Sequence, residues 1–327
     1  MSDARRPPQR QPASPPSPAE TIVLWPIPPF RLDFTVWALR RRARNAIDRW
    51  DGVTYRRTVL LDHGPAELSV SQDGPPTKPR LIVTLRPPSA TTSELVFLAG
   101  MVEGLLGLRV DLAPWYRMAA RQPRLRALSE QFRGLKPPRF PTVLEAIVNA
   151  VACQQLSLEV GLELLNRLAR VCAQHHQGGR RVGTHAFPGA GDLAALPLST
   201  YRAIGFSRQK AHAIVKLASA ILAGDLDLEG LRRVDDAQAR DQLVGLVGVG
   251  RWTAEYVLLR GLGRLHVFPG DDVAAQKSLA RRLARTQPFD YAGVQKTVRA
   301  WQPWAGMVYF HLLLEGLAAV SALNPPH

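Results

Sequence analysis

The chain has 327 residues, 46% of them hydrophobic, which is enough apolar content for two domains with cores of their own. Its 42 lysines and arginines exceed its 27 acidic residues by 15, so the expected partner is acidic, and nucleic acid is the usual one. Arginine supplies 36 of the 42 and pairs bidentately with phosphate oxygens, but charge alone fits an arginine-rich surface equally well.

Cysteine, histidine and apolar content exclude several classes of protein. Cys153 and Cys172 are too few for a disulfide framework, a four-cysteine zinc site or a four-cysteine iron–sulfur cluster. His175 and His176 lack the spacing of metal ligands, and we expect neither a metal nor another cofactor. Because no apolar run has the length of a membrane span and the N-terminus lacks a signal-peptide core, we expect a protein of the reducing cell interior.

The first third of the chain predicts a small α+β domain. Residues 1–20 hold six prolines and three arginines with almost no apolar side chain, which predicts a disordered tail. Between Thr21 and about Leu112, short β-branched or alternating runs are separated by turns rich in Gly, Pro and Asp. They predict an antiparallel sheet with strands at 21–27, 55–61, 66–72 and 80–86, and helices at 33–45 and 93–107.

Helical periodicity dominates from residue 113 to residue 327. Gly, Pro and Ser mark the joints, and residues 177–192 form a loop-rich insertion. The expected fold class is therefore α+β, an antiparallel-sheet layer domain (21–112) followed by an all-α domain (113–327). The predicted helices of the second domain lie at 142–157, 160–174, 209–222, 239–246, 251–262, 273–284 and 307–320.

A glycine turn, "LVGVGRWTA" (246–254), separates two of these helices. Gly248 and Gly250 permit positive φ and a close approach of another backbone, and they expose the first amides of the next helix, where an anion is favoured. Taken alone, the turn is explained better by a plain helix–helix connection with a glycine C-cap. It is neither a dinucleotide fingerprint nor a Walker loop, because no strand precedes it and a third glycine is missing.

The surrounding residues strengthen the functional interpretation. The turn, continued through "RWTAEYVLLRG" to "VFPGDD", resembles the helix-hairpin-helix of the DNA glycosylase superfamily, with Val247 where proline is usual. "AIVNAVACQQLS" (146–157) and "AIGFSRQKAHAI" (203–214) are typical of the same helical domain, and the N-terminal layer domain extends the likeness from about Leu24. The whole pattern is similar to the 3-methyladenine DNA glycosylase II family, the branch that removes alkylated purines.

That resemblance implies partners and setting. The expected partner is double-stranded DNA containing alkylated bases, and the process is base excision repair. We expect a monomer without an iron–sulfur cluster and without membrane association, located in the cytoplasm beside the nucleoid if the source is a bacterium.

Asp271 and Asp272 directly precede the helix predicted from Val273, so one of them is expected to be its N-cap. We expect Asp271 to cap the helix and Asp272 to project toward a cleft. The resemblance makes Asp272 the catalytic residue, because a fixed carboxylate stabilises the oxocarbenium-like sugar formed as an N-glycosidic bond breaks. Trp252 occupies the position where bifunctional members carry a Schiff-base lysine, so we expect hydrolysis to an abasic site without strand cleavage.

The base pocket is expected to be aromatic. Trp252 and Tyr256 lie at i and i+4 on one helix face, where they are either core residues or a wall that stacks on a cationic purine. The resemblance places both in the base pocket and has Phe34 or Trp37 close its far side. Leu313 stands where the family often has tryptophan, and Ala305-Gly306 replace the usual Arg-Ser.

The remaining expected site residues contact DNA outside the pocket. Gln155, with Leu156 beside it, is expected to fill the gap left by the displaced base, the alternative being a helix end that never touches DNA. Arg208 and Lys210 either hold a second phosphate or begin a solvated helix. The hairpin residues expected at the DNA backbone are Gly248, Gly250, Arg251 and Thr253.

Two other functions fit parts of the pattern. A non-catalytic helix-hairpin-helix DNA-binding protein needs the glycines but has no reason to combine Asp272 with Trp252 and an aromatic pocket. A glycosylase of the same fold for oxidised bases is disfavoured by Trp252 in the lysine position. The sequence leaves open which damaged bases are accepted, hypoxanthine and etheno adducts included.

Overall fold

The computed structural model describes residues 20–62, 64–87, 90–176 and 185–319. The predicted N-terminal tail lies outside these residues, except for Glu20, which begins the first strand. Residues 177–184, half of the predicted insertion at 177–192, lie outside them as well. Among the described residues, no helix is long and apolar enough to cross a membrane.

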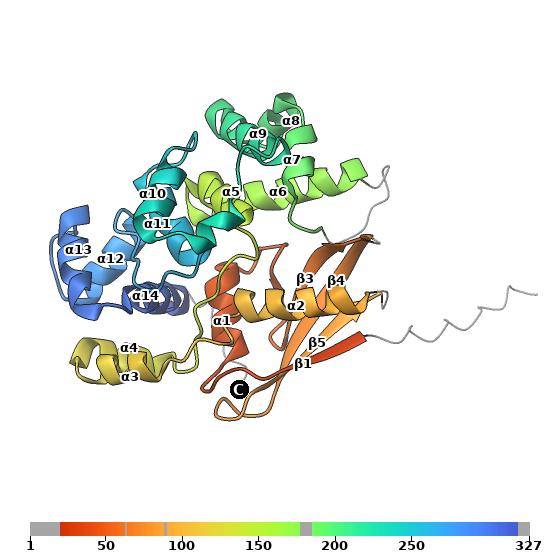
Figure 1. Ribbon diagram of the computed structural model, residues 1–327. Helices are drawn as coiled ribbons and strands as arrows, with labels where there is room; N and C mark the ends of the chain where they lie inside the picture. Colours follow the sequence, from red (N-terminus) through yellow and green to blue (C-terminus); the bar gives the residue numbers. More distant parts are fainter. Residues whose placement is uncertain (1–19, 63, 88–89, 177–184, 320–327) are drawn as a thin grey trace, which may run out of the picture.

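The N-terminal part is an antiparallel sheet covered by two helices, α1 (Leu32–Arg40) and α2 (Thr92–Leu105) (Figure 1). Burial alternates along β4, so that Leu68 and Val70 face a core shared with Val36 of α1 and Leu98 of α2. The predicted strands are confirmed, and the two-residue β2 is an addition. In the order β1-β5-β4-β3-β2, the strands are β1 (Glu20–Leu24), β5 (Arg80–Arg86), β4 (Gly64–Asp73), β3 (Thr54–Leu61) and β2 (Arg49–Trp50).

The rest of the described chain is helical and builds two cores, which confirms the α+β fold class. One core joins α5, α6, α9 and α11, and the other joins α3, α4, α12 and α14. Helix α11 belongs to both, through Val257 in the first and Leu259 in the second. The helices are α3 (Ala113–Ala120), α4 (Pro123–Gln131), α5 (Val143–Cys153), α6 (Leu158–His176), α7 (Ala190–Ala195), α8 (Leu198–Ala203), α9 (Arg208–Leu222), α10 (Asp236–Val244), α11 (Arg251–Arg260), α12 (Val273–Arg282), α13 (Tyr291–Val298) and α14 (Ala305–Ala319), with 3-10 turns at Glu229–Arg233 and Arg299–Trp301.

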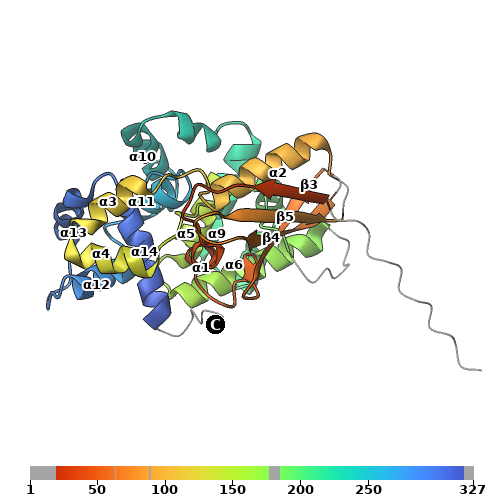
Figure 2. The ribbon, with the colours of Figure 1, turned by 90° about the horizontal axis from the view of Figure 1, so that it is seen from below.

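Helix α1 lies between the sheet and the helical part (Figures 1 and 2) and ends earlier than predicted. Arg41, inside the predicted helix 33–45, adopts the left-handed conformation with φ 62° and caps α1 through a bond from its amide to the Trp37 carbonyl. The chain then turns at Asn45, whose Oδ1 accepts from the amides of Ile47 and Asp48. The turn leaves Arg41 only 4% exposed.

A buried ionic network ties the sheet to the helical part. Arg57 of β3 donates to Asp48 Oδ1 (2.9 Å) and to Glu145 Oε2 of α5 (2.5 Å), and the Tyr55 hydroxyl donates to the same Asp48 oxygen (2.8 Å). All four side chains are buried. Removing one member would leave an uncompensated charge in the interior, which typically costs about 3–5 kcal/mol.

Candidate active site

A cavity of about 1160 Å³ lies between the two helical cores. Its walls are the segment 153–158 that links α5 to α6, the first half of α11, α12 from Val273 to Arg281, and α14 from Tyr309 to Leu317. The N-terminal domain contributes Arg41 and Arg42. Of the residues predicted for the site, the cavity lining brings together Asp272, Trp252, Tyr256, Leu313, Gly250, Arg251, Thr253, Gln155 and Leu156.

Asp272 is both the N-cap of α12 and a wall of the cavity. Its Oδ1 accepts from the amide of Ala275 (2.9 Å), and its Oδ2 accepts from the Tyr309 hydroxyl (3.0 Å) and, at the limit of a hydrogen bond, from Trp252 Nε1 (3.5 Å). Burial raises the pKa of Tyr309 well above its usual range, so its hydroxyl stays protonated and keeps donating. The carboxylate is thus held in one orientation.

The prediction that Asp271 caps the helix is wrong. The capping position is the residue immediately before the first helical one, which is Asp272. Asp271 instead forms a bidentate pair with Arg251, with Nε to Oδ2 at 2.6 Å and a terminal nitrogen to Oδ1 at 3.0 Å. The Arg251 guanidinium also lies 3.8 Å from the centre of the Tyr291 ring, so this predicted phosphate contact is already engaged within the protein.

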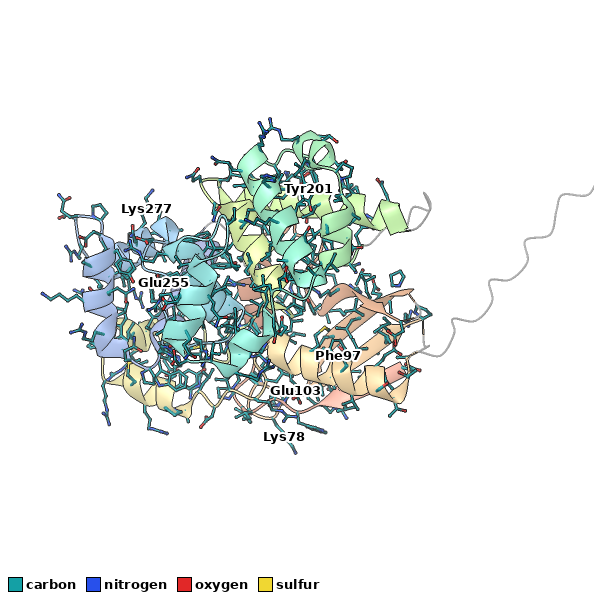
Figure 3. The ribbon with its side chains drawn as sticks, turned by 45° about the horizontal axis from the view of Figure 1, so that its top comes forward. Lys78, Phe97, Glu103, Tyr201, Glu255 and Lys277 are labelled. Atoms are coloured by element: carbon teal, nitrogen blue, oxygen red, sulfur yellow. The ribbon has the colours of Figure 1, made fainter. Side chains whose placement is uncertain are left out.

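Glu255 fixes the loop that carries Asp272, a role that the sequence analysis missed. Its carboxylate is 2% exposed and accepts from the amide of Gly270 (2.9 Å) and from the Tyr291 hydroxyl (2.7 Å). Burial raises the pKa of Glu255. Figure 3 marks Glu255 within the helical part. The available signal was an acidic residue inside the otherwise apolar stretch of α11, where a buried charge needs a partner.

Gly306 brings α14 against the same loop. Its amide donates to the Leu265 carbonyl (2.6 Å), and a Cβ on Gly306 would lie 2.5 Å from Leu259 Cδ1 and 2.8 Å from that carbonyl. A larger residue at 306 would therefore push α14, with Tyr309 one turn further on, away from Asp272.

The predicted aromatic wall forms, with Tyr256 more deeply buried than Trp252. The two rings lie 5.4 Å apart at 35°, and Tyr256 is 3% exposed. The Tyr256 hydroxyl accepts from Arg41 (2.9 Å), and the buried guanidinium of Arg260 lies 5.6 Å from its ring centre. Tyr256 is therefore both a core residue, packed in the first core, and a part of the cavity wall.

Phe34 and Trp37 do not line the cavity. The Phe34 ring packs edge-on against Phe132 at 5.5 Å and beneath the Arg31 guanidinium, and Trp37 packs on the second helical core. Both side chains are taken up by packing of α1 on the helical part. Arg41, one turn beyond Trp37, lines the cavity from the N-terminal domain instead.

The hairpin and the loop after α5 are bonded to each other. Gly248 has φ 81°, and its carbonyl accepts from Gln154 Nε2 (2.8 Å), which also donates to Thr253 Oγ1 (2.8 Å). Gly250 is the N-cap of α11, and a Cβ there would meet nothing within 4 Å among the described residues. The space in front of the first turn of α11 is open.

The loop that carries Gln155 and Leu156, the residues predicted to fill the gap left by a displaced base, is held in place by hydrogen bonds. Gln155 adopts a left-handed conformation with φ 54°, which costs a non-glycine residue about 1 kcal/mol or more and is typical of functional sites. Gln155 is exposed, and Leu156 is 42% exposed. Lys210 donates to the carbonyls of Ala152 (3.1 Å) and Gln154 (2.7 Å), so its ammonium holds this loop, while Arg208 is exposed at the first position of α9.

The glycine hairpin between α10 and α11 and the capping aspartate Asp272 both border the cavity between the two helical cores. Residues 148–303 match the family described as HhH-GPD superfamily base excision DNA repair protein, and they form an HhH-GPD domain.

Curated relatives carry the names of DNA glycosylases and of a DNA repair enzyme. The chain is 28% identical to a DNA-3-methyladenine glycosylase of Bacillus subtilis over 205 residues, which are 62% of this chain and 66% of the relative. It is 29% identical to DNA-3-methyladenine glycosylase 2 of Escherichia coli over 183 residues, 55% and 60% of the two chains. A probable bifunctional transcriptional activator/DNA repair enzyme of Mycobacterium tuberculosis is 28% identical over 79% of this chain and 49% of its own length. The matches thus span about half to two thirds of these relatives.

Solved structures share the fold. The 3-methyladenine DNA-glycosylase from Archaeoglobus fulgidus superposes with a TM-score of 0.76 over 90% of this chain and 97% of its own, at 22% identity. The 3-methyladenine DNA glycosylase of Schizosaccharomyces pombe, in complex with abasic DNA, superposes with a TM-score of 0.53 over 64% of this chain and 97% of its own.

Proposed function

We propose that this protein is a monofunctional DNA glycosylase of base excision repair, acting on double-stranded DNA that contains alkylated purines of the 3-methyladenine and 7-methylguanine class. The observation that carries the proposal is the Asp272 carboxylate, held by Ala275, Tyr309 and Trp252 at the wall of a large cavity beside the hairpin. The HhH-GPD domain and the names of the relatives support the same activity.

Asp272 acts as an electrostatic catalyst. As the N-glycosidic bond breaks, the bonding electrons leave with the base and the sugar gains positive charge, which a fixed carboxylate stabilises. Removing one preorganised group of this kind typically costs 10²–10³-fold in rate, about 3–4 kcal/mol. A water molecule near the same carboxylate then adds to the sugar and leaves an abasic site.

The chemistry we propose stops at the abasic site. The first turn of α11 offers Trp252, whose indole is not a nucleophile. Among the described lining residues the only lysine is Lys277, which is exposed on α12 (Figure 3). We therefore infer that no Schiff base forms with the sugar and that the DNA strand stays intact.

DNA is bound through the hairpin, and the base is displaced by the loop after α5. The amides that begin α11 face open space beside Gly250, where the positive end of the helix dipole favours a phosphate. Extruding a base costs a few kcal/mol, and Gln155 or the exposed Leu156 fills the vacated stack. Lys210 keeps that loop in place during displacement.

The test uses duplex DNA treated with a methylating agent. We expect the purified protein to release free methylated purines and the DNA to break only after alkali. The Asp272→Asn variant should release them about 10²–10³-fold more slowly and still bind DNA with strong salt dependence. Breaks without alkali would refute the monofunctional assignment, and tight binding by the wild-type protein without base release would indicate a DNA clamp.

A further inference from the structure

Basic side chains in the wall of the cavity differ in whether the protein already engages them. Hydrogen bonds or a carboxylate within the protein engage Arg41, Arg42 and Arg251. Lys277 and Arg281 of α12 are exposed, and neither has a carboxylate partner among the described residues. A terminal nitrogen of Arg281 donates to Ser278 Oγ (3.1 Å), which is neutral. Two uncompensated positive charges therefore border the cavity in contact with solvent.

Both cations have a fixed position relative to Asp272, because all three residues belong to one helix. Asp272 is the N-cap of α12, and at 1.5 Å per residue Lys277 and Arg281 lie roughly 8 and 14 Å further along its axis. Their spacing of four residues places them next to each other on one face of the helix. This face is turned to the cavity, since Val273 and Ser278 line it as well.

Helix α12 leads away from the hairpin. Its start lies beside the first turn of α11, where Trp252 Nε1 is 3.5 Å from Asp272 Oδ2. Its end lies beside α4, which is remote from α10 (Figure 1), with Arg282 donating to the Arg124 carbonyl (3.0 Å). Along this wall, Asp272 therefore lies between the phosphate position expected at Gly250 and the two free cations.

The chemistry of the two side chains selects phosphate as their ligand. Ammonium and guanidinium groups donate charge-assisted hydrogen bonds to phosphate oxygens, and a DNA strand presents one phosphate per nucleotide. The damaged base is a poor ligand for them, because an alkylated purine itself carries positive charge. Since Lys277 and Arg281 are exposed, water and salt screen their repulsion of such a base in the cavity.

We infer that Lys277 and Arg281 form a second site for the DNA backbone, which binds phosphates of the damaged strand on the side of the displaced nucleotide away from the hairpin. This inference rests on the proposed glycosylase function and extends its DNA interface. The strand is then held on both sides of the nucleotide whose sugar faces Asp272, so the two residues position that nucleotide without touching the reacting atoms.

Binding to a duplex with an abasic-site analogue tests the site, because it requires no excision. Each phosphate contact contributes about 0.9 to the slope of log K against log salt, so its loss costs roughly eightfold in affinity at 0.1 M relative to 1 M salt. Lys277→Gln and Arg281→Gln should each show both changes, and Lys277→Arg, which keeps the charge, should show neither. Both side chains are exposed, so thermal unfolding of the variants should match wild type.

The matched controls remove an exposed charge of the same kind from the N-terminal part. Lys78 lies in the loop between β4 and β5, well apart from Lys277 in Figure 3, and Arg86 ends β5. Lys78→Gln and Arg86→Gln should leave the salt slope and the affinity unchanged. A slope lowered equally in the controls would mean that Lys277 acts through the net charge of the protein, and would overturn the inference.

Single methylphosphonate linkages, which are uncharged, locate the contacts. Moved one at a time along the damaged strand, they should weaken wild-type binding on both sides of the abasic-site analogue. On one side this loss should disappear in Lys277→Gln and Arg281→Gln, and on the other side in Gly250→Ala. Wild-type slopes in the two glutamine variants, or the same sensitive linkages as in Gly250→Ala, overturn the inference. Failure of the wild-type protein to release any methylated purine refutes the proposed function instead, because the binding results do not depend on excision.

Discussion

Substitutions at the two hairpin glycines should distinguish an effect on stability from an effect on DNA binding, because Gly248 is crowded and Gly250 faces open space. At Gly248, φ is 81° and a Cβ would lie 2.8 Å from the Cβ of Ala213 on α9. Gly248→Ala should therefore cost about 1–2 kcal/mol for the left-handed backbone and roughly 1–3 kcal/mol for overpacking. At Gly250, φ is −97° and a Cβ meets nothing, so Gly250→Ala should leave the free energy of unfolding within about 0.5 kcal/mol.

DNA affinity, in contrast to stability, should depend on Gly250. A methyl group on Gly250 occupies the space where we expect a phosphate, so binding to a duplex with an abasic-site analogue should weaken at least tenfold, about 1.4 kcal/mol. Fluorescence anisotropy from 50 to 200 mM salt measures the affinity and its salt slope, and thermal unfolding measures stability. For Gly248→Ala we expect a Tm lower by roughly 4–15 °C. Wild-type affinity in Gly250→Ala would remove the hairpin from the DNA interface.

Three further changes probe the interior. Tyr309→Phe removes a donor from Asp272 and should slow single-turnover excision about tenfold at unchanged DNA affinity; an unchanged rate would refute its positioning role. Burial lowers the pKa of His311 to about 4, so stability should be complete above about pH 6.5 and fall by roughly 3 kcal/mol toward pH 4, and His311→Leu should flatten this slope in denaturant titrations. Arg57→Met should destabilise the fold by about 3–5 kcal/mol, partly recovered by adding Glu145→Gln; a Tm within 2 °C of wild type would contradict that estimate.

The parts of the fold that sequence reasoning predicted are those with local signals. Alternation and periodicity marked β3, β4 and β5 and the long helices, whereas the two-residue β2 has too little pattern to find. The contiguous motif placed Asp272, Trp252 and the hairpin at one site. The sequence analysis chose Asp271 as the cap of α12, one residue before the actual cap, Asp272. The cap is set by where α12 begins, which composition does not determine.

Contacts between distant segments were beyond the sequence. Arg41 sits in "RRRARN", which has the same pattern as an exposed basic helix, and only the left-handed turn makes it a cavity residue. Tyr309 lies in an apolar run where an aromatic side chain predicts core packing, and its hydroxyl meets Asp272 from 37 positions away. The aromatic closure expected from Phe34 or Trp37 failed because packing of α1 on the helical part takes up both rings.

Helix α11 packs in both helical cores, and this affects whether the protein or the DNA changes shape during repair. Its Val257 and Leu259 are fully buried in opposite cores, so spreading the cores apart would expose apolar surface on both sides of one helix. The hairpin and Glu255 are attached to this same rigid axis. In the function that we propose, such a protein would serve as a fixed template, and the distortion that brings a base to Asp272 would fall on the DNA, most easily at steps already weakened by damage.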